Sequence, residues 1–320
     1  MGKVILWSAA GILLIILILG FIIYLRDMNQ AYERISGESS RIIHAPYGKI
    51  EFSAGGNPSG IPVLVIHGGG GGFDQGELIA EVVLDDSFRW IAPSRFGYLG
   101  SELPVEATWD DQADAYAFLL DHLGIGSVDV VAMSQGGPSA LLFALNYPEK
   151  VTSLTCLSCG VASLATDSQE EANKKGKILR TIFRYDLLYW TVSTLFKKSL
   201  LGIIGATDEV IQGLTPAQME KADHFIEYMN PASPRSAGAA FDNTATMPGN
   251  RISAISVPTL IIHAKDDMLQ LYQNAEFAAS AIPRSELISY ESGGHILMIV
   301  QQDEVREAVA DYIMRTGNPG

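Results

Sequence analysis

The sequence predicts an α/β protein with a mostly parallel, eight-stranded sheet and helices on both faces. Eight short apolar segments are strand candidates, at residues 41–44, 49–52, 62–67, 89–93, 128–132, 151–157, 258–263 and 286–290. Patterns with apolar residues three or four apart predict helices at residues 108–123, 137–147, 272–281 and 303–315. Strands and helices in alternation indicate parallel strands joined by helical crossovers.

The composition indicates a folded chain with a large core. Of 320 residues, 48% are hydrophobic and 18% are charged, which excludes an intrinsically disordered chain. The formal net charge is −14, so a basic surface for nucleic acid is excluded. Cys156 and Cys159 are too few for a disulfide framework. Their apolar surroundings favour buried strand residues over a redox or zinc site.

Residues 4–25 are a 22-residue run without a charge, against the roughly 20 residues needed to cross a bilayer core of ~30 Å. The run is longer than the apolar part of a cleaved signal peptide, and it has no small-x-small cleavage site. We therefore expect residues 1–26 to be a retained transmembrane anchor. Basic residues flank both ends, Lys3 on one side and Arg26 and Arg34 on the other, so the orientation in the membrane stays open.

Residues 27–40 are polar and carry no strand pattern, so we expect a juxtamembrane linker that is partly helical. Residues 41–320 are expected to form one domain. A turn-like tetrapeptide, residues 45–48, separates its first two strands, which predicts that the sheet begins antiparallel. The alternation is interrupted between residues 159 and 255 by a stretch of helical composition. We expect this stretch, at about residues 160–255, to be an inserted cap.

Residues 128–137, VDVVAMSQGG, run from an apolar strand into a serine flanked by small residues. This pattern fits a nucleophile elbow, in which the positions two before and two after the serine have little room for side chains. Gly136 keeps that rule, whereas Ala132 stands where glycine is usual. Pro138 suits the first turn of a helix that starts behind the serine. Ser134 is therefore the candidate nucleophile, and an ordinary strand-to-helix turn is the alternative.

Five consecutive glycines, residues 68–72, follow another apolar strand. Backbone N–H groups of such a loop can approach a developing oxyanion, because no Cβ blocks them. Our candidate donors for an oxyanion hole are the N–H groups of Gly69 and Gln135. A phosphate-binding loop is the alternative, but the G-x-x-x-x-G-K spacing is absent. His67, just before the glycines, is expected to brace the loop rather than to catalyse.

A serine nucleophile needs an oriented base and an electrostatic partner. The strand at residues 258–263 is followed by Asp266 and Asp267, and one of these carboxylates can orient a histidine. His295 follows two glycines after the last strand, and we expect it to be the base. The remaining histidines lie in strand, helix or cap contexts that favour structural roles; they are His44, His122, His224 and His263. The chain order Ser134, Asp267, His295 is that of the α/β-hydrolases.

With these segments, the chain from about residue 41 to its C-terminus resembles the α/β-hydrolase-fold serine hydrolases. The segments that carry the resemblance are HGGGGGF, AMSQGG, IIHAKDD and GGH. Residues 92–101 also resemble the family's D-x-x-G-x-G-x-S segment, with Ser94 where Asp is frequent. The family's acid usually follows by three positions the small residue that ends its strand, here Ala264, so the resemblance favours Asp267 over Asp266. Some members place the acid after the sixth strand, and Asp167 would then be the candidate.

The resemblance implies that Ser134 attacks an ester-like carbonyl while His295 takes its proton and Asp267 orients the imidazole. It implies an acyl-enzyme that water releases, and no metal or organic cofactor. We therefore expect a membrane-anchored hydrolase of carboxylic esters with apolar or lipid-like acyl groups. The alternatives are another activity of the fold, such as an aminopeptidase, carbon–carbon bond hydrolase or acyltransferase, and a non-catalytic binding protein. Nothing in the sequence predicts the oligomeric state.

Seven of the 22 basic residues lie within one stretch of 25 positions in the expected cap, among apolar side chains, at positions 174, 175, 177, 180, 184, 197 and 198. A basic, amphipathic composition of this kind is suited to a membrane surface. We expect the cap to face the bilayer that the anchor spans. The alternative is an ordinary hydrophobic lid over an apolar pocket.

Overall fold

One eight-stranded sheet is the centre of the computed structural model, which describes residues 2–37, 39–163 and 166–317. Its strands are β1 (Ser40–Ala45), β2 (Gly48–Gly56), β3 (Ile61–Ile66), β4 (Phe88–Pro93), β5 (Val128–Met133), β6 (Val151–Leu157), β7 (Thr259–Ala264) and β8 (Ser285–Tyr290). They pair in the order β1-β2-β4-β3-β5-β6-β7-β8, and only the β1–β2 and β2–β4 pairs are antiparallel. The predicted fold class, with its antiparallel start, is confirmed.

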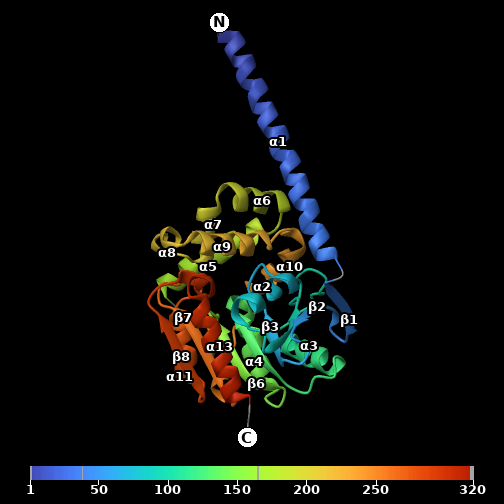
Figure 1. Cartoon of the computed structure of the whole chain (residues 1–320), viewed down its shortest axis with the longest axis vertical. Coiled ribbons are helices and arrows are strands. Elements are labelled where there is room, and N and C mark those ends of the chain that lie inside the picture. The colour runs from blue at the N-terminus through green and yellow to red at the C-terminus, as the bar shows by residue number, and fades with distance from the viewer. Residues whose placement is uncertain (1, 38, 164–165, 318–320) are drawn as a thin grey trace.

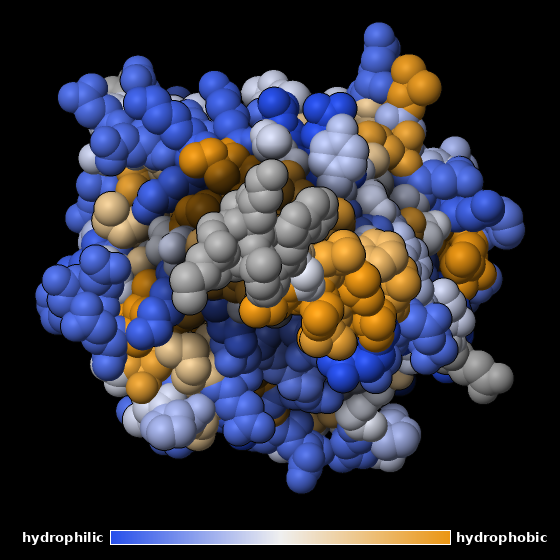
Figure 2. All heavy atoms as spheres, turned by 90° about the horizontal axis from the view of Figure 1, so that it is seen from above, coloured by the Kyte–Doolittle hydropathy of each residue, from blue (hydrophilic) through white to orange (hydrophobic). Residues whose placement is uncertain are grey.

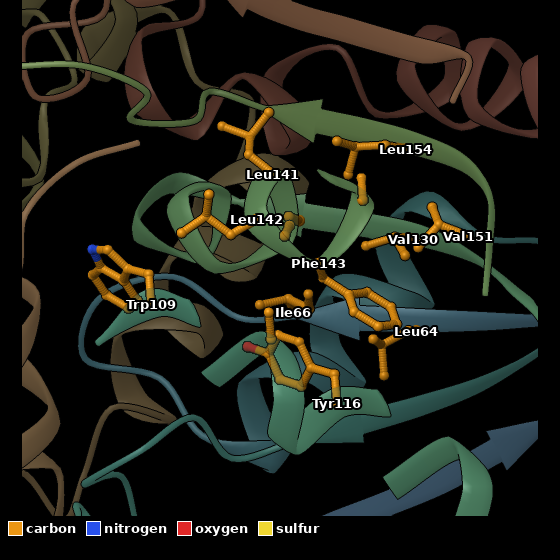
Figure 3. Packing of buried hydrophobic residues seen from close by; sticks show 14 of the residues in the cluster. Leu64, Ile66, Trp109, Tyr116, Val130, Leu141, Leu142, Phe143, Val151 and Leu154 are labelled. Atoms are coloured by element: carbon orange, nitrogen blue, oxygen red, sulfur yellow. The ribbon is translucent and has the colours of Figure 1, made fainter. Parts of the chain in front are cut away.

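Helices cover both faces of the sheet because its central strands are apolar on both sides. Leu64 and Ile66 of β3 pack with α3 (Trp109–His122), α4 (Gly137–Asn146) and α11 (Gln273–Ala281), in the cluster that Figure 3 shows in part. The alternate residues Val63 and Val65 pack with α2 (Phe73–Val83) and α13 (Gln302–Thr316). The carboxyl ends of the parallel strands meet at one edge, where ligand sites of such sheets form.

The chain between β6 and β7, here called the cap segment (residues 158–258), has helices as its only regular structure in the part that the structure describes. They are α5 (Asp167–Ile182), α6 (Asp186–Leu195), α7 (Lys197–Ile204), α8 (Asp208–Gly213), α9 (Pro216–Glu227) and α10 (Ser236–Asp242), with short 3-10 turns at Ser233–Arg235 and Gly249–Ala254. Most of these helices lie above the sheet in Figure 1, on the side from which the N-terminal helix rises.

That N-terminal helix, α1 (Gly2–Ser36), is continuous for 35 residues. It contains a stretch long and apolar enough to cross a membrane, and almost none of that stretch is buried. The segment after residue 26, expected as a linker, continues the helix to Ser36. There α1 contacts α6, because Met28 and Ala31 are buried against Trp190.

Both cysteines are free and buried. Cys156 lies in β6, as expected, whereas Cys159 lies two residues beyond the end of that strand. Its thiol donates to the carbonyl of Ala132 at 3.3 Å, so Cys159 packs under the turn that follows β5. The expectation that both are strand residues is wrong for Cys159, because β6 ends at Leu157.

Candidate active site

Ser134 lies at the sharp turn between β5 and α4, at the carboxyl edge of the sheet. Its φ of 54° is in the left-handed region that few non-glycine residues adopt, which is typical of a strained nucleophile elbow. Gly136 is required sterically, because a Cβ there would lie 2.7 Å from the carbonyl oxygen of His67. Ala132, the departure from the usual glycine, is fully buried at the end of β5.

His295 faces Ser134, and its Nε2 lies 2.8 Å from the serine Oγ. Gly293 and Gly294 before it have φ values of 149° and 55°, so the loop from β8 adopts a conformation that disfavours larger residues. Asp266 holds this loop in place: its carboxylate accepts the N–H of Gly294 at 2.8 Å and the hydroxyl of Ser292 at 2.7 Å.

Asp267 contacts the other side of the same imidazole, with 2.8 Å between its Oδ2 and Nδ1 of His295. Its Oδ1 accepts the N–H groups of Leu269 and Gln270, both at 2.9 Å. Burial alone would raise the pKa of Asp267, but the charges and hydrogen bonds of His295 and His263 outweigh burial and lower the pKa to about 2. A carboxylate only accepts, so Nδ1 donates to Asp267 and a neutral imidazole presents Nε2 as the acceptor for Ser134.

The structure therefore brings Ser134, His295 and Asp267 together, and it places Asp266 and Asp167 elsewhere. Asp167 is exposed at the first turn of α5. His263 is buried at the end of β7, where its Nε2 lies 2.6 Å from the carbonyl oxygen of Gln270. It supports the segment that carries Asp267, with 3.4 Å between its Nε2 and the Asp267 carboxylate.

The glycine loop after β3 lies beside the serine. A Cβ built on Gly68 would be 3.0 Å from Ser134 Cβ, and one built on Gly69 would be 3.9 Å from Gln135 Cγ. Among the described residues, the amide hydrogens of Gly69 and Gln135 have no protein acceptor. Gly70 has a φ of 75° and contacts Phe183 so closely that a Cβ would lie 2.3 Å from the ring. The amides of Gly69 and Gln135 therefore lie beside Ser134 and stay available to an acceptor from outside the described chain.

A buried network that sequence reasoning did not find fixes this loop. Arg95 contacts Asp242 of α10 through two hydrogen bonds of 2.7 Å, and it also donates to the carbonyls of His67 and Gly68 at 3.0 Å. The hydroxyl of Tyr98 donates to Asp242 at 2.6 Å. Burial alone would lower the pKa of Arg95, but Asp242 raises it, so this cation stays charged. Arg95 and Tyr98 lie within the segment that resembles the family motif, but nothing in the sequence marks Asp242.

His67 braces the loop, as the sequence analysis expects. Its Nε2 accepts the N–H of Arg95 at 2.9 Å, and its Nδ1 lies 2.7 Å from the carbonyl oxygen of Gly68. Burial and the nearby Arg95 lower the pKa of His67 well below its usual value, so the ring stays neutral.

Ser94 stands where the family motif has Asp. Glu51 of β2 supplies a carboxylate there instead, because Ser94 Oγ donates to this buried side chain at 3.0 Å.

A pocket of about 960 Å³, its open mouth included, lies over Ser134 and His295. Its walls are mainly apolar side chains of the cap segment and of the residues after His295, including Leu179, Phe183, Leu201, Ile204, Phe225, Ile226, Met298 and Ile299. Within the described ranges, no group of three or more His, Cys, Asp or Glu side chains is arranged to hold a metal ion. A nucleophile, a base and oxyanion donors beside an apolar pocket can perform acyl transfer.

Residues 61–302 match the model of the alpha/beta hydrolase fold family, and the chain belongs to that family. It is 29% identical over 262 residues to the uncharacterized hydrolase YcgS of Bacillus subtilis, covering 79% of this chain and 90% of that protein. A 2-hydroxymuconate semialdehyde hydrolase of a Pseudomonas species is 28% identical, over 80% of this chain and 87% of that protein.

A solved structure, that of a membrane phospholipase A described as a bacterial virulence factor, has a TM-score of 0.69 and 19% identity. The match covers 99% of this chain and all of that one, so the likeness of fold includes α1. The family match and the two hydrolase relatives together support the conclusion that the chain is a hydrolase.

Proposed function

We propose that this hydrolase is a membrane-anchored serine esterase that cleaves carboxylic esters with apolar or lipid-like acyl groups. The observation that carries the proposal is the hydrogen-bonded chain from Ser134 through His295 to Asp267, with two hydrogen bonds of 2.8 Å. Beside it lie an apolar pocket and backbone amides that have no acceptor among the described residues. Each group is preorganised, because the backbone strain at Ser134, the loop held by Asp266 and the Arg95 network fix it before substrate binds.

In the proposed reaction, Ser134 Oγ attacks the ester carbonyl carbon while its proton passes to Nε2 of His295. The carbonyl oxygen becomes an oxyanion that accepts the N–H groups of Gly69 and Gln135. When the C–O bond breaks, His295 gives its proton to the leaving alkoxide, and the acyl group stays on Ser134. Water then attacks the acyl-enzyme, His295 takes the water's proton and returns it to Ser134, and the carboxylic acid leaves.

Labelling with a serine-directed fluorophosphonate tests the nucleophile. The native chain is expected to be labelled, and Ser134→Ala is not. Ser139→Ala is a matched control, because Ser139 lies in the adjoining helix and does not contact His295. Equal labelling of the native chain and Ser134→Ala contradicts the assignment. A series of p-nitrophenyl esters then tests the acyl preference, with longer acyl chains expected to have higher kcat/KM until they fill the apolar pocket.

A carbon–carbon bond hydrolase is the second candidate, and the relative that favours it is the 2-hydroxymuconate semialdehyde hydrolase. The same triad can serve that reaction, because fold and site do not fix the substrate. Cleavage of a vinylogous 1,5-diketone without cleavage of any p-nitrophenyl ester would support this candidate over the esterase.

The proposed level of the membrane surface rests on the contacts between α1 and the cap segment. The apolar part of α1 ends at Leu25, and the next turn contacts α6: Trp190 Nε1 donates to Asp27 at 3.0 Å, and its ring lies 5.4 Å from that of Tyr24. Trp and Tyr favour the membrane interface. If residues 4–25 span the bilayer, its surface therefore lies at the level of α6.

Exposed apolar side chains lie on this face of the cap segment, among them Leu187, Leu195 and Phe196, and Figure 2 shows hydrophobic side chains on the side from which α1 rises. We propose that they enter the membrane surface. With the chain in vesicles, a fluorophore on Leu195→Cys is expected to be quenched by brominated lipid. A fluorophore on Val105→Cys is not expected to be quenched, because Val105 is 94% exposed but lies outside the cap segment. The native cysteines are buried and do not interfere. Equal quenching at both positions contradicts the proposed contact.

A further inference from the structure

A second cavity, of about 1000 Å³ with its open part included, adjoins the apolar pocket. Its walls come from α5, from the end of α10 with the residues after it, and from the segment that follows Asp267. Gln135, Arg180 and Gln270 line both cavities, so the two meet beside the nucleophile. A substrate whose carbonyl binds the Gln135 amide can therefore extend into both.

The chemistry of this second cavity differs from that of the first. Lys177 and Arg180 lie three residues apart on α5 and line it, and among the described residues neither has a carboxylate partner. Its one acidic lining residue, Asp242, is already bound by Arg95 and Tyr98. The side-chain oxygen of Gln135 is buried and has no hydrogen-bond donor in the described part of the chain. The cavity thus offers two free cations and an acceptor for a hydroxyl group.

This cationic cavity stands out in a chain whose formal net charge is −14. We propose that the substrate is an amphiphilic ester that places its apolar chain in the first pocket and an anionic, hydroxyl-bearing group, phosphate or carboxylate, in the second. Lys177 and Arg180 bind the anion, Arg180 with the planar fork that suits both groups, and Gln135 accepts a hydroxyl hydrogen. The inference rests on the proposed esterase function and deepens it by naming the substrate class.

The test compares three esters with the same acyl chain, using the full chain in a neutral detergent: a monoacylglycerol, the corresponding acylglycerol 3-phosphate, and an acylated glycerate. The kcat/KM of at least one anionic ester is expected to exceed that of the neutral ester about tenfold or more. The better anionic ester identifies phosphate or carboxylate as the preferred group.

The double variant Lys177→Gln with Arg180→Gln is expected to lower this ratio of anionic to neutral kcat/KM about tenfold. Lys174→Gln with Arg184→Gln removes the same charge from exposed positions that line neither cavity, and it is expected to keep the ratio. A readout that needs no variant is inhibition of monoacylglycerol hydrolysis by glycerol 3-phosphate or glycerate, the groups that would leave. We expect competitive inhibition of the native chain.

The inference is overturned if the native chain hydrolyses the monoacylglycerol as fast as both anionic esters, or if both double variants change the ratio equally. Either result leaves the proposed esterase intact. If no ester is cleaved and the fluorophosphonate does not label Ser134, the proposed function itself fails, so the two failures are distinguishable.

Discussion

In the proposed mechanism, Asp267 determines which nitrogen of His295 is free to accept a proton from Ser134. The exchange of this carboxylate for an amide, Asp267→Asn, offers Nδ1 an N–H group as well as an oxygen and so permits the wrong tautomer. We expect kcat for p-nitrophenyl esters to fall by about 10⁴-fold, as in other triads. Asp266→Asn is the matched control, because it alters the neighbouring carboxylate, which is hydrogen-bonded to the loop before His295 and not to the imidazole in the described structure. A loss of less than about tenfold is expected. Equal losses in the two variants would contradict the assignment of Asp267.

Asp129 is a buried carboxylate, the second residue of β5, whose only side-chain partner in the described structure is the Ser153 hydroxyl, at 2.6 Å. Burial raises its pKa to about 6, although the Ser153 hydrogen bond opposes the shift. Below about pH 4 the group is protonated in both the folded and the unfolded chain, so it has no effect there. As pH rises toward 6, only the unfolded chain ionises readily, and the free energy of unfolding falls.

Asp129→Asn removes that penalty. At pH 7.5 the variant is expected to be more stable than the native chain by on the order of 3 kcal/mol, because the pKa is raised by about two units and one pKa unit corresponds to about 1.4 kcal/mol. The gain should vanish below about pH 4. Denaturant unfolding at several pH values measures it, with Asp86→Asn at an exposed position as the control. A gain that is independent of pH would show that ionisation is not its cause.

The local chemistry of the candidate site follows from sequence more fully than its support does. Ser134 and the glycines around it can be recognised in the sequence, because a tight turn restricts which residues fit. The choice of Asp267 rests on its distance from the end of a strand, and the structure places that residue at His295. Asp242 gives no such signal: it is an aspartate at the end of a helix, and its partner Arg95 is 147 residues away in the chain. Only the fold brings the two together.

At the scale of elements, the eight strands were predictable because each contains a short apolar run, and the central strands β3, β5, β6 and β7 are buried along almost their whole length. The pattern does not predict α2, which starts directly after the glycine run and contains Gly76. Gly76 is unfavourable in a helix on its own, but here it allows α2 to approach the sheet, since a Cβ would lie 2.7 Å from that of Ala92. The helices of the cap segment depend on tertiary contacts, so composition predicts their class but not their ends.

The ion pair of Arg95 and Asp242 joins two elements, α10 of the cap segment and the loop after β4. Asp242→Ala leaves a buried cation without its partner, and we expect the free energy of unfolding to fall by about 3–5 kcal/mol. Arg95→Met combined with Asp242→Leu is expected to recover most of this loss, because no buried charge remains. Esterase activity should stay low in both variants, since neither braces the glycine loop.

Denaturant unfolding in detergent, followed by tryptophan fluorescence, measures the stability of these variants. The outcome that contradicts this account is a double variant as unstable as Asp242→Ala but with native activity.

At the scale of the whole molecule, the N-terminal helix α1, the proposed membrane anchor, packs against the hydrolase domain and is not a flexible tether. Arg34, near its end, lies 3.5 Å from Asp74, the carboxylate that also binds buried Arg235 at the base of the cap segment. Two residues before Arg34 on the same helix, the hydroxyl of Tyr32 donates to Asp186 at 2.8 Å. Because Asp74 is the second residue of α2, directly after the glycine run, α1 is linked to the cap segment and to the oxyanion loop at once.

A rigid link of this kind should matter only when the substrate is in the bilayer. The double variant Tyr32→Phe with Trp190→Phe keeps an aromatic ring at both positions of the contact of α1 and α6 but removes the hydrogen bonds to Asp186 and Asp27. With the full chain in vesicles, we expect hydrolysis of a long-chain ester in the membrane to fall about fivefold or more, because each bond to a charged group contributes about 1.5–3 kcal/mol. Hydrolysis of p-nitrophenyl butyrate from the aqueous phase should change less than about twofold, since neither residue lines the pocket. Thr194→Val, a change at an exposed position of α6, is the matched control. A parallel fall for both substrates would mean that the contact stabilises the catalytic domain as a whole and does not set its position at the membrane.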